Sequence, residues 1–245
     1  MARLDWVTSR PVAHRGLHDG RIVENSLQAV EAALEAGFAV EVDVQAAAGL
    51  EPVVFHDAAL ERLTGEVGPV AARTADQLAK IPLKGTRERI PTLRALLDLV
   101  AGRTPLIIEV KTDWSGMPEF CARIVDLLKD YPGPVAVMSF DPKAIQAFRR
   151  IAIFLPRGVV AEASNQWAPP ATDAAQRLRL RHLLHFPQSR PHFIAYRVDD
   201  LPQLGPLVAR RVFGLPLLAW TVHDETQRAQ AQRWADQIIF EGFRP

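Results

Sequence analysis

The sequence has little of what marks secreted, membrane-bound or nucleic-acid-binding proteins. Among its 245 residues there is one cysteine, Cys121, so the chain can form no disulfide within itself. No run approaches the roughly 18 uncharged apolar residues of a membrane-spanning helix, and the first residues lack the apolar segment of a signal peptide. The net charge of +1 argues against a nucleic-acid footprint. We therefore expect a cytoplasmic protein that neither spans a membrane nor binds nucleic acid, and the sequence gives no indication of its oligomeric state.

Low-complexity tracts and Ser/Gly-rich linkers are also absent, so nothing divides the chain into separate domains. Hydrophobic residues make up 48% of the sequence, which is enough for a large core. Cys121 lies in a helix-like apolar run and is most simply a small core residue. The sequence thus predicts one domain over residues 1–245.

Short apolar runs typical of strands alternate with segments typical of helices. Strands are expected over residues 12–14, 39–44, 105–111, 135–140, 153–161, 192–196, 216–222 and 237–240. Helices are expected over residues 27–34, 93–100, 118–130, 142–150, 172–185, 200–213 and 225–235. This alternation favours a parallel sheet with crossover helices. Eight such units in a chain of this length predict an α/β fold, a TIM (β/α)₈ barrel, with a doubly wound open sheet as the alternative.

One segment departs from this alternation. A further short strand is expected at residues 52–55, and the pattern then loosens over residues 58–90, which contain several glycines and prolines. Only short helical pieces are expected there, such as residues 75–80. We interpret residues 58–90 as a small inserted subdomain that follows the second strand of the barrel.

Glu41 and Asp43 alternate with valines in the second expected strand. Alternate residues of a strand share a face, so the two carboxylates point the same way. At a separation of about 6 Å they repel by about 3 kcal/mol at an effective dielectric constant of 20, and burial adds to this cost. The pair therefore needs a cation, or one carboxyl group must be protonated. The structural alternative is that both lie at the rim of an edge strand.

Other ionisable residues also fall where expected strands end. His14 and Arg15 follow the first strand, His56 follows the short strand after the acidic one, and Glu109 and Lys111 close the next. Catalytic groups of a TIM barrel lie at the C-terminal ends of its strands. We therefore predict that these residues and the acidic pair form one site.

The residue types in this site point to a particular chemistry. Three carboxylates without a cysteine suit a hard cation, Mg²⁺ or Ca²⁺, which takes oxygen ligands and leaves positions open for substrate oxygens. Arg15 and Lys111 supply positive charge suited to a phosphate group. Two histidines can share the proton transfers of phosphoester cleavage, because their pKa lies near neutrality. Together these features predict phosphodiester hydrolysis.

Each residue also has a structural alternative. Glu109 and Lys111 could form an ion pair inside the barrel, and either histidine could be a satisfied structural residue. Asp57 could do no more than cap the turn that follows it, and Trp220 could belong to the core. The remaining histidines considered, which we interpret as structural or surface residues, are His18, His182, His185 and His192.

A set of short motifs runs in order from the first expected strand to the last. They are His14-Arg15-Gly16, Glu24-Asn25-Ser26, Glu41-Val42-Asp43, Val54-Phe55-His56-Asp57, Leu60 with Thr64-Gly65, Ile90-Pro91-Thr92-Leu93, Glu109-Val110-Lys111, Ser139-Phe140 and Trp220-Thr221-Val222. The first motif alone would be a weak signal, but the ordered set is specific. It resembles the glycerophosphodiester phosphodiesterase family.

The resemblance implies a TIM-like barrel with a small insertion after the second strand, and a metal-dependent hydrolysis of glycerophosphodiesters to sn-glycerol 3-phosphate and an alcohol. It assigns the divalent metal to Glu41, Asp43 and Glu109, acid/base catalysis to His14 and His56, phosphate contacts to Arg15 and Lys111, and the rings flanking the substrate to Phe140 and Trp220. The expected partner is thus a small-molecule glycerophosphodiester.

The sequence departs from the family pattern at four places. Val23 replaces a proline before Glu24, and the turn Ala47-Ala48-Gly49 lacks its usual Thr and Asp. His223 stands where Asn is common, and the closing segment 240–245 lacks the acid at the usual place. The last two departures lie at the rim and bear on substrate choice. None of the departures removes a proposed catalytic group. Two alternatives stay open: a phosphodiesterase acting on a lysophospholipid or another diester, and a non-catalytic binder of phosphate ligands on the same barrel.

Overall fold

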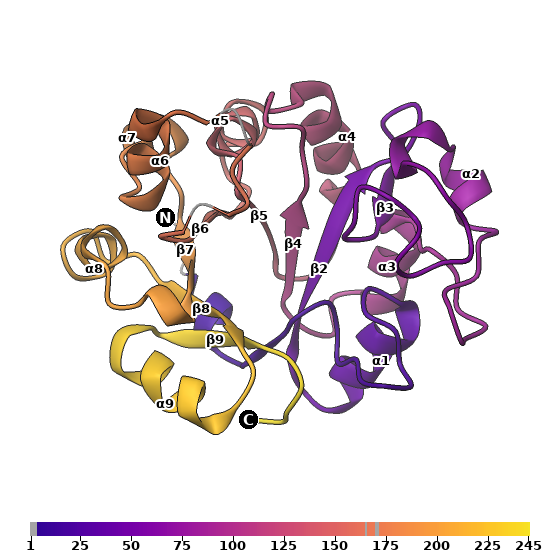
Figure 1. Ribbon diagram of the computed structural model, residues 1–245, viewed down its shortest axis with the longest axis horizontal. Helices are drawn as coiled ribbons and strands as arrows, with labels where there is room; N and C mark the ends of the chain where they lie inside the picture. The colour runs from indigo at the N-terminus through magenta and orange to yellow at the C-terminus, as the bar shows by residue number, and fades with distance from the viewer. Residues whose placement is uncertain (1–3, 165, 170–171) are drawn as a thin grey trace.

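The computed structural model describes residues 4–164, 166–169 and 172–245. Its centre is a closed barrel of parallel strands with helices around it (Figure 1). The barrel strands are β1 (Val12–Ala13), β2 (Ala39–Ala46), β4 (Leu106–Val110), β5 (Val135–Ser139), β6 (Arg157–Ala161), β7 (Phe193–Arg197), β8 (Leu217–Val222) and β9 (Gln237–Phe240). Because β1 pairs in parallel with both β2 and β9, the sheet has no open edge there. The barrel prediction is confirmed and the open sheet is excluded.

Helices follow most of the strands, and polar caps start several of them. They are α1 (Leu27–Glu35), α3 (Leu93–Val100), α4 (Pro118–Leu128), α5 (Pro142–Ile151), α6 (Ala174–Arg181), α7 (Phe186–Ser189), α8 (Leu204–Arg211) and α9 (Glu225–Trp234), with 3₁₀ turns η1 (Asp5–Thr8) and η3 (Val198–Asp200). The side chains of Ser26, Thr92 and Asp224 each accept a hydrogen bond from a backbone N–H of the first turn. Such caps satisfy donors that have no partner inside the helix, so each of these helices starts directly after its cap residue.

The bounds of three expected elements differ from the structure by four residues at one end. The strand expected at 153–161 begins only at Arg157, because Ile153 and Phe154 are largely exposed and bury little apolar surface. The helix expected at 172–185 ends at Arg181, and α7 follows Leu183, whose left-handed φ of 57° interrupts a right-handed helix. The helix expected at 200–213 starts at Leu204, beyond the turn that contains Pro202.

Residues 58–90 build a separate layer on one side of the barrel. The layer begins after β3 (Pro52–Val54), which pairs antiparallel with β2, and includes η2 (Val70–Ala72) and the short helix α2 (Ala75–Leu78). Its core contains Phe55, Leu60, Val70, Leu78 and Ile90, packed apart from the barrel core. Residues 58–90, which we interpret as an insertion after the second strand, lie in this layer, and the layer carries the loop after β3 against the barrel mouth.

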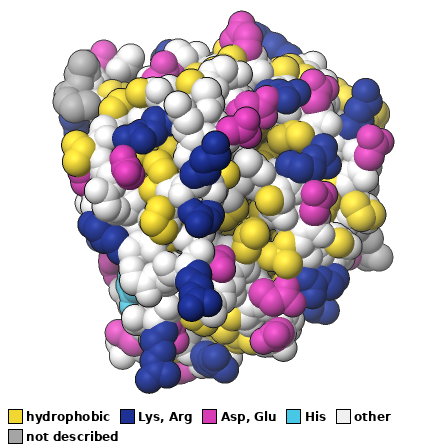
Figure 2. All heavy atoms as spheres, turned by 90° about the vertical axis from the view of Figure 1, so that its right-hand side faces the viewer, with side chains coloured by type: hydrophobic (Ala, Val, Ile, Leu, Met, Phe, Trp, Pro, Cys, Tyr) yellow, Lys and Arg dark blue, Asp and Glu magenta, His cyan; other side chains and the backbone are white. Residues whose placement is uncertain are grey.

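The surface between the helices carries charges of both signs. Figure 2 shows the side of the molecule at the right of Figure 1, where basic and acidic side chains are interspersed with apolar ones. Arg103 pairs with Glu31 and Arg123 with Glu51 among the surface ion pairs. Exposed pairs of this kind contribute about 0–1 kcal/mol each. None of the helices in the described ranges combines the length and apolar character that a bilayer crossing requires.

Packing rather than surface charge therefore supplies the stability. The larger apolar cluster lies between the strands and the helices, and it includes Cys121, which is fully buried as expected for a core residue. Burial and the nearby Asp141 raise the pKa of the Cys121 thiol to about 12. The thiol is therefore un-ionised at neutral pH, and thiolate is the reactive form.

His185 gives the fold a predictable dependence on pH. Burial, with Arg179 nearby, lowers the pKa of His185 to about 4 from 6.5. The unfolded chain then binds a proton that the folded chain does not, so stability is complete above pH 6.5 and falls as pH drops toward 4. A shift of this size corresponds to about 3 kcal/mol. We expect His185→Gln to flatten this part of the pH profile of the unfolding free energy, measured in urea between pH 4 and 8; an unchanged slope would contradict it.

Candidate active site

Strand geometry selects the side chains that meet at the barrel mouth. A smaller apolar cluster fills the barrel interior, with Val12, Ala39, Ile107, Met138, Leu218 and Ile239 among its members. Alternate residues of a strand face the same side. Residues two or four positions after these interior residues therefore also face inward, at the C-terminal end of each strand. Those positions hold His14, Glu41, Asp43, Glu109, Lys111, Phe140, Trp220 and Glu241. The expected convergence of site residues on one end of the barrel is observed.

Glu41, Asp43 and Glu109 form a buried acidic cluster. Each offers an oxygen atom, and these atoms lie within 4.8 Å of one another. All three residues are buried, Glu41 completely. Burial raises the pKa of Glu41, and the neighbouring Asp43 and Glu109 raise it further. The sequence-level prediction of a buried pair of like charges is therefore correct, with a third carboxylate added by β4.

The donor set of this cluster fits a hard divalent cation. One oxygen of Glu41 accepts a hydrogen bond from the backbone N–H of Arg15 at 2.9 Å, whereas its Oε1 is buried and has no hydrogen-bond partner in the described part of the chain. Carboxylate oxygens that are buried and unsatisfied are costly unless a charge compensates them. Mg²⁺ and Ca²⁺ take such oxygen ligands, so the residues present suit either ion.

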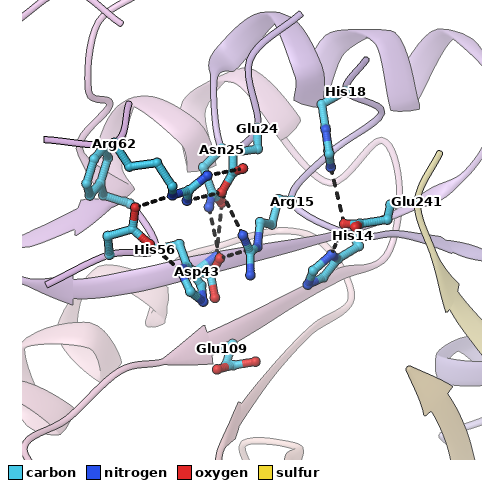
Figure 3. A network of polar contacts seen from close by, with 12 residues as sticks. His14, Arg15, His18, Glu24, Asn25, Asp43, His56, Arg62, Glu109 and Glu241 are labelled. Carbon is cyan, nitrogen blue, oxygen red and sulfur yellow. Dashed lines mark hydrogen bonds and ion pairs between the residues drawn. The ribbon is translucent and has the colours of Figure 1, made fainter. Parts of the chain in front are cut away.

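Two basic side chains hold Asp43 in its ionised form. Lys111 Nζ lies 2.9 Å from Asp43 Oδ1 and also contacts Glu109, and Arg15 Nε lies 3.0 Å from Asp43 Oδ2. Burial alone would raise the pKa of Asp43, but these two cations outweigh it and hold the pKa far below the usual range. Asn25 accepts a hydrogen bond from the backbone N–H of Asp43 and donates one to its side chain. Asp43 is thus the fixed centre of the network in Figure 3.

His14 is paired with Glu241, the residue after β9. Its Nδ1 lies 2.5 Å from Glu241 Oε2, and Figure 3 shows the two side chains facing each other. Burial lowers the pKa of His14. Burial alone would raise the pKa of Glu241, but its hydrogen bond with His14 and the nearby His18 lower it far below the usual range. An ionised carboxylate can only accept, so Nδ1 of His14 carries the proton and Nε2 is left as an acceptor.

His56 has a carboxylate partner of its own. Its Nδ1 lies 2.8 Å from Asp57 Oδ1, and Arg62 contacts the other oxygen of Asp57. Arg62 also reaches Glu24 at 2.7 and 2.8 Å, and Glu24 accepts from Arg15 at 2.7 Å. Asp57 therefore does more than cap a turn. The chain Arg15–Glu24–Arg62–Asp57 ties the inserted layer to the barrel and orients His56.

The two histidines line one cavity. It has a volume of about 190 Å³ and is also lined by Arg15, Glu109 and Lys111. The Trp220 and Phe140 rings meet edge to face at its wall, with centroids 5.4 Å apart. Trp220 Nε1 is buried and donates no hydrogen bond within the described residues. Trp220 is thus a wall residue with a free donor rather than a fully enclosed core side chain.

Several residues of the site were not assigned from the sequence. Glu241 in the closing segment had no assigned role, yet it lies beside His14. It follows the last strand directly, so the strand-end rule that selected the other residues applies to it too. Glu24 and Asn25 stood in a quoted motif without a role. No motif or spacing in the sequence pointed to Trp167 or Arg62. Trp167 lies in a loop after β6, and its ring centroid is 5.9 Å from that of His56.

His18 also lies in this site rather than apart from it. Its Nε2 lies 3.5 Å from Glu241 Oε2, and His223 Nδ1 lies 3.4 Å from Glu241 Oε1. The rim departure at His223 noted in the sequence therefore places a third imidazole beside the same carboxylate.

Comparison with known proteins gives a consistent result. The model of the glycerophosphoryl diester phosphodiesterase family matches residues 14–243. A putative glycerophosphodiester phosphodiesterase of Bacillus subtilis, YhdW, is 27% identical over 90% of this chain and 89% of its own. A glycerophosphodiester phosphodiesterase of Caldanaerobacter subterraneus is 28% identical over 61% of this chain, an alignment that spans 65% of that protein.

Solved structures show the same fold. An Oleispira antarctica phosphodiesterase, determined in complex with the product sn-glycerol-3-phosphate, has a TM-score of 0.77 at 22% identity, covering 94% of this chain and 92% of its own. A putative glycerophosphoryl diester phosphodiesterase from Silicibacter pomeroyi has a TM-score of 0.77 at 24% identity, with 94% and 89% covered. Both are similar in architecture along nearly the whole length of each chain.

Proposed function

Because the chain belongs to the glycerophosphoryl diester phosphodiesterase family, we propose that it hydrolyses glycerophosphodiesters to sn-glycerol 3-phosphate and an alcohol, with a divalent metal. One observation carries the proposal: two histidines, each oriented by its own carboxylate, line a cavity at a cluster of three buried carboxylates. Such an arrangement supports the proposal because it could bind a metal ion and supply two proton-transfer groups to a single phosphate.

In this proposal Glu41, Asp43 and Glu109 hold Mg²⁺ or Ca²⁺, which would lower the pKa of a bound hydroxyl and neutralise charge on phosphorus. Arg15 and Lys111 contact the phosphate oxygens from the same cavity. Their contacts with Asp43 position both cations before substrate arrives, so little reorganisation is needed.

The histidines divide the proton transfers. His14 is neutral, since burial lowers its pKa, and its free Nε2 suits removal of the proton from the glycerol hydroxyl that attacks phosphorus. His56 then protonates the alcohol oxygen as its bond to phosphorus breaks. In the second step the roles reverse: His56 takes a proton from the water that opens the cyclic phosphate, and His14 returns a proton to the glycerol oxygen.

Phe140 and Trp220 flank the substrate in this proposal. Their edge-to-face contact fixes both rings, and the unpaired Nε1 of Trp220 can donate to a substrate oxygen. The cavity at the two histidines has a volume of about 190 Å³, and a larger cavity of about 710 Å³ shares His56, Glu109 and Lys111 with it. The small cavity accommodates the glycerophosphate part of a diester, and a panel of substrates decides which alcohol the larger one accepts.

The proposed function is tested by measuring glycerol 3-phosphate released from a panel of glycerophosphodiesters and one lysophospholipid, with Mg²⁺, Ca²⁺ or EDTA. Release that requires metal and favours the small diesters supports the proposal and identifies the preferred alcohol. Turnover of the lysophospholipid alone would replace the substrate assignment. Binding of a diester without any turnover would show that the barrel is a phosphate-ligand binder.

Glu241→Gln tests the orientation of His14. The substitution removes the charge that stabilises a protonated His14, so we expect kcat to fall about 10²-fold, within the range of general acid–base effects. Glu241 raises the pKa of His14, so its loss should move the acidic limb of the kcat/KM profile to lower pH. Glu241→Asp keeps the charge and should restore part of the rate. If the acidic limb of the kcat/KM profile is unchanged in Glu241→Gln, the contact between Glu241 and His14 is only structural.

A further inference from the structure

A second cluster of metal-binding side chains lies beside the acidic one. It consists of His14, His18 and Glu241, whose ligand atoms lie within 4.8 Å of one another, with His223 on the solvent side. The residues come from the loops after β1, β8 and β9, which are neighbours in the barrel. In Figure 3 the His14 and His18 rings point at the Glu241 carboxylate from opposite sides.

Two distances in this cluster are longer than ordinary hydrogen bonds and close to the separation of two metal ligands. His18 Nε2 is shielded from solvent and forms no hydrogen bond in the described part of the chain; it lies 3.5 Å from Glu241 Oε2. His223 Nδ1 lies 3.4 Å from Glu241 Oε1. In a tetrahedral site with bonds of about 2.1 Å, ligand atoms lie about 3.4 Å apart. The contact of His18 with Oε2 already has this spacing, and His223 faces the other oxygen of the same carboxylate.

The donor types select a different ion from the one that suits the acidic cluster. Three imidazole nitrogens and one carboxylate oxygen match the ligands of four-coordinate Zn²⁺. Mg²⁺ and Ca²⁺ prefer oxygen ligands and are poorly served by imidazole. The side chain of His223 is 51% exposed, so it can turn toward an ion without disturbing the core.

We propose that His14, His18, Glu241 and His223 form a second metal site that binds Zn²⁺, and that zinc bound there stops turnover. His14 Nδ1 and Glu241 Oε2 are 2.5 Å apart, about 1 Å closer than two tetrahedral ligands. Zinc must therefore replace the proton between them and separate the pair. The site itself follows from geometry alone, whereas the inhibition rests on the proposed catalytic role of His14.

The binding test uses Co²⁺ as a spectroscopic substitute for zinc on the full chain. Excess Mg²⁺ is present so that the acidic cluster is filled. A four-coordinate site rich in histidine gives intense visible absorption, and Zn²⁺ should displace it. In His18→Gln with His223→Asn, loss of two ligands should weaken binding of Zn²⁺ by at least about tenfold, since even residues that only support metal ligands contribute about 10- to 100-fold. His182→Gln is the matched control and should bind as the wild type does.

The inhibition test measures diester hydrolysis in Mg²⁺ against increasing Zn²⁺, each variant relative to its own zinc-free rate. The zinc concentration for half inhibition should rise at least about tenfold in the double variant. Equal zinc affinity and equal inhibition in the wild type and the double variant would overturn the proposal. A weak cobalt spectrum that Mg²⁺ abolishes would also overturn it, because the cobalt would then occupy the acidic cluster. A strong cobalt spectrum in a chain without phosphodiesterase activity would support the zinc site and refute the proposed function separately.

Discussion

His14→Ala and His56→Ala are each expected to lower kcat by about 10²- to 10⁴-fold, the range that positioned general acids and bases contribute. Each histidine is oriented by a carboxylate at hydrogen-bond distance, His14 by Glu241 and His56 by Asp57. When one imidazole ring is removed, water must carry out the proton transfer that this ring performed. The measurement is the steady-state release of glycerol 3-phosphate from the preferred diester.

The same experiment separates loss of catalysis from loss of the metal. Neither histidine belongs to the cluster of Glu41, Asp43 and Glu109, so Mg²⁺ affinity should be retained in both variants. Because the histidines act in one sequence of steps, the double variant should be little worse than either single one. His182→Ala is the control and should keep the wild-type rate. Full activity in either His14→Ala or His56→Ala would refute the proposed acid/base pair.

Glu41→Gln should abolish metal-dependent activity while stabilising the metal-free protein. Glu41 is completely buried beside Asp43 and Glu109, so its charge is repelled when no cation is present. Removing that charge should raise Tm by a few degrees, since about 1 kcal/mol corresponds to roughly 2–4 °C in a chain of this size. Thermal unfolding in EDTA at pH 8, with kcat in Mg²⁺, measures both effects.

Asp43→Asn is the matched comparison. It also neutralises a buried carboxylate of the cluster, but Asp43 is surrounded by cations whereas Glu41 is surrounded by carboxylates. Asp43 pairs with both Arg15 and Lys111, and its loss leaves two cations without their shared partner. Breaking one side of a buried ion pair costs about 3–5 kcal/mol. Both variants should be inactive, yet their Tm values should move in opposite directions. A fall in Tm for Glu41→Gln would show that Glu41 is held by contacts other than a metal.

The barrel was predictable because its signals are local. Alternation of apolar runs with capped helices depends on residues close in sequence, such as Thr92 at the start of α3. The same holds for Glu41, Asp43 and Glu109, since the two-residue period of a strand fixes which side chains share a face. Element ends were less predictable. The run at 153–156 is apolar enough for a strand, but Ile153 and Phe154 are largely exposed, and burial is a tertiary property.

Partners across the barrel depend on closure of the sheet. Glu241 is separated from His14 by 227 positions and lies beside it only because β9 pairs with β1. The link from Arg62 to Glu24 likewise requires the inserted layer to fold back on the barrel mouth. Such contacts leave no periodicity in the sequence, since each partner is positioned by a different element.

The sequence by itself determined the barrel, its insertion and the strand ends at which His14, Glu41, Asp43, His56, Glu109 and Lys111 stand, because these follow from periodicities of two and 3.6 residues. Only the tertiary structure decided how those residues are paired. It placed Asp43 between two cations, oriented each histidine with a carboxylate, and gathered His14, His18 and His223 around Glu241. Those pairings depend on distances across the closed barrel, which no local pattern specifies.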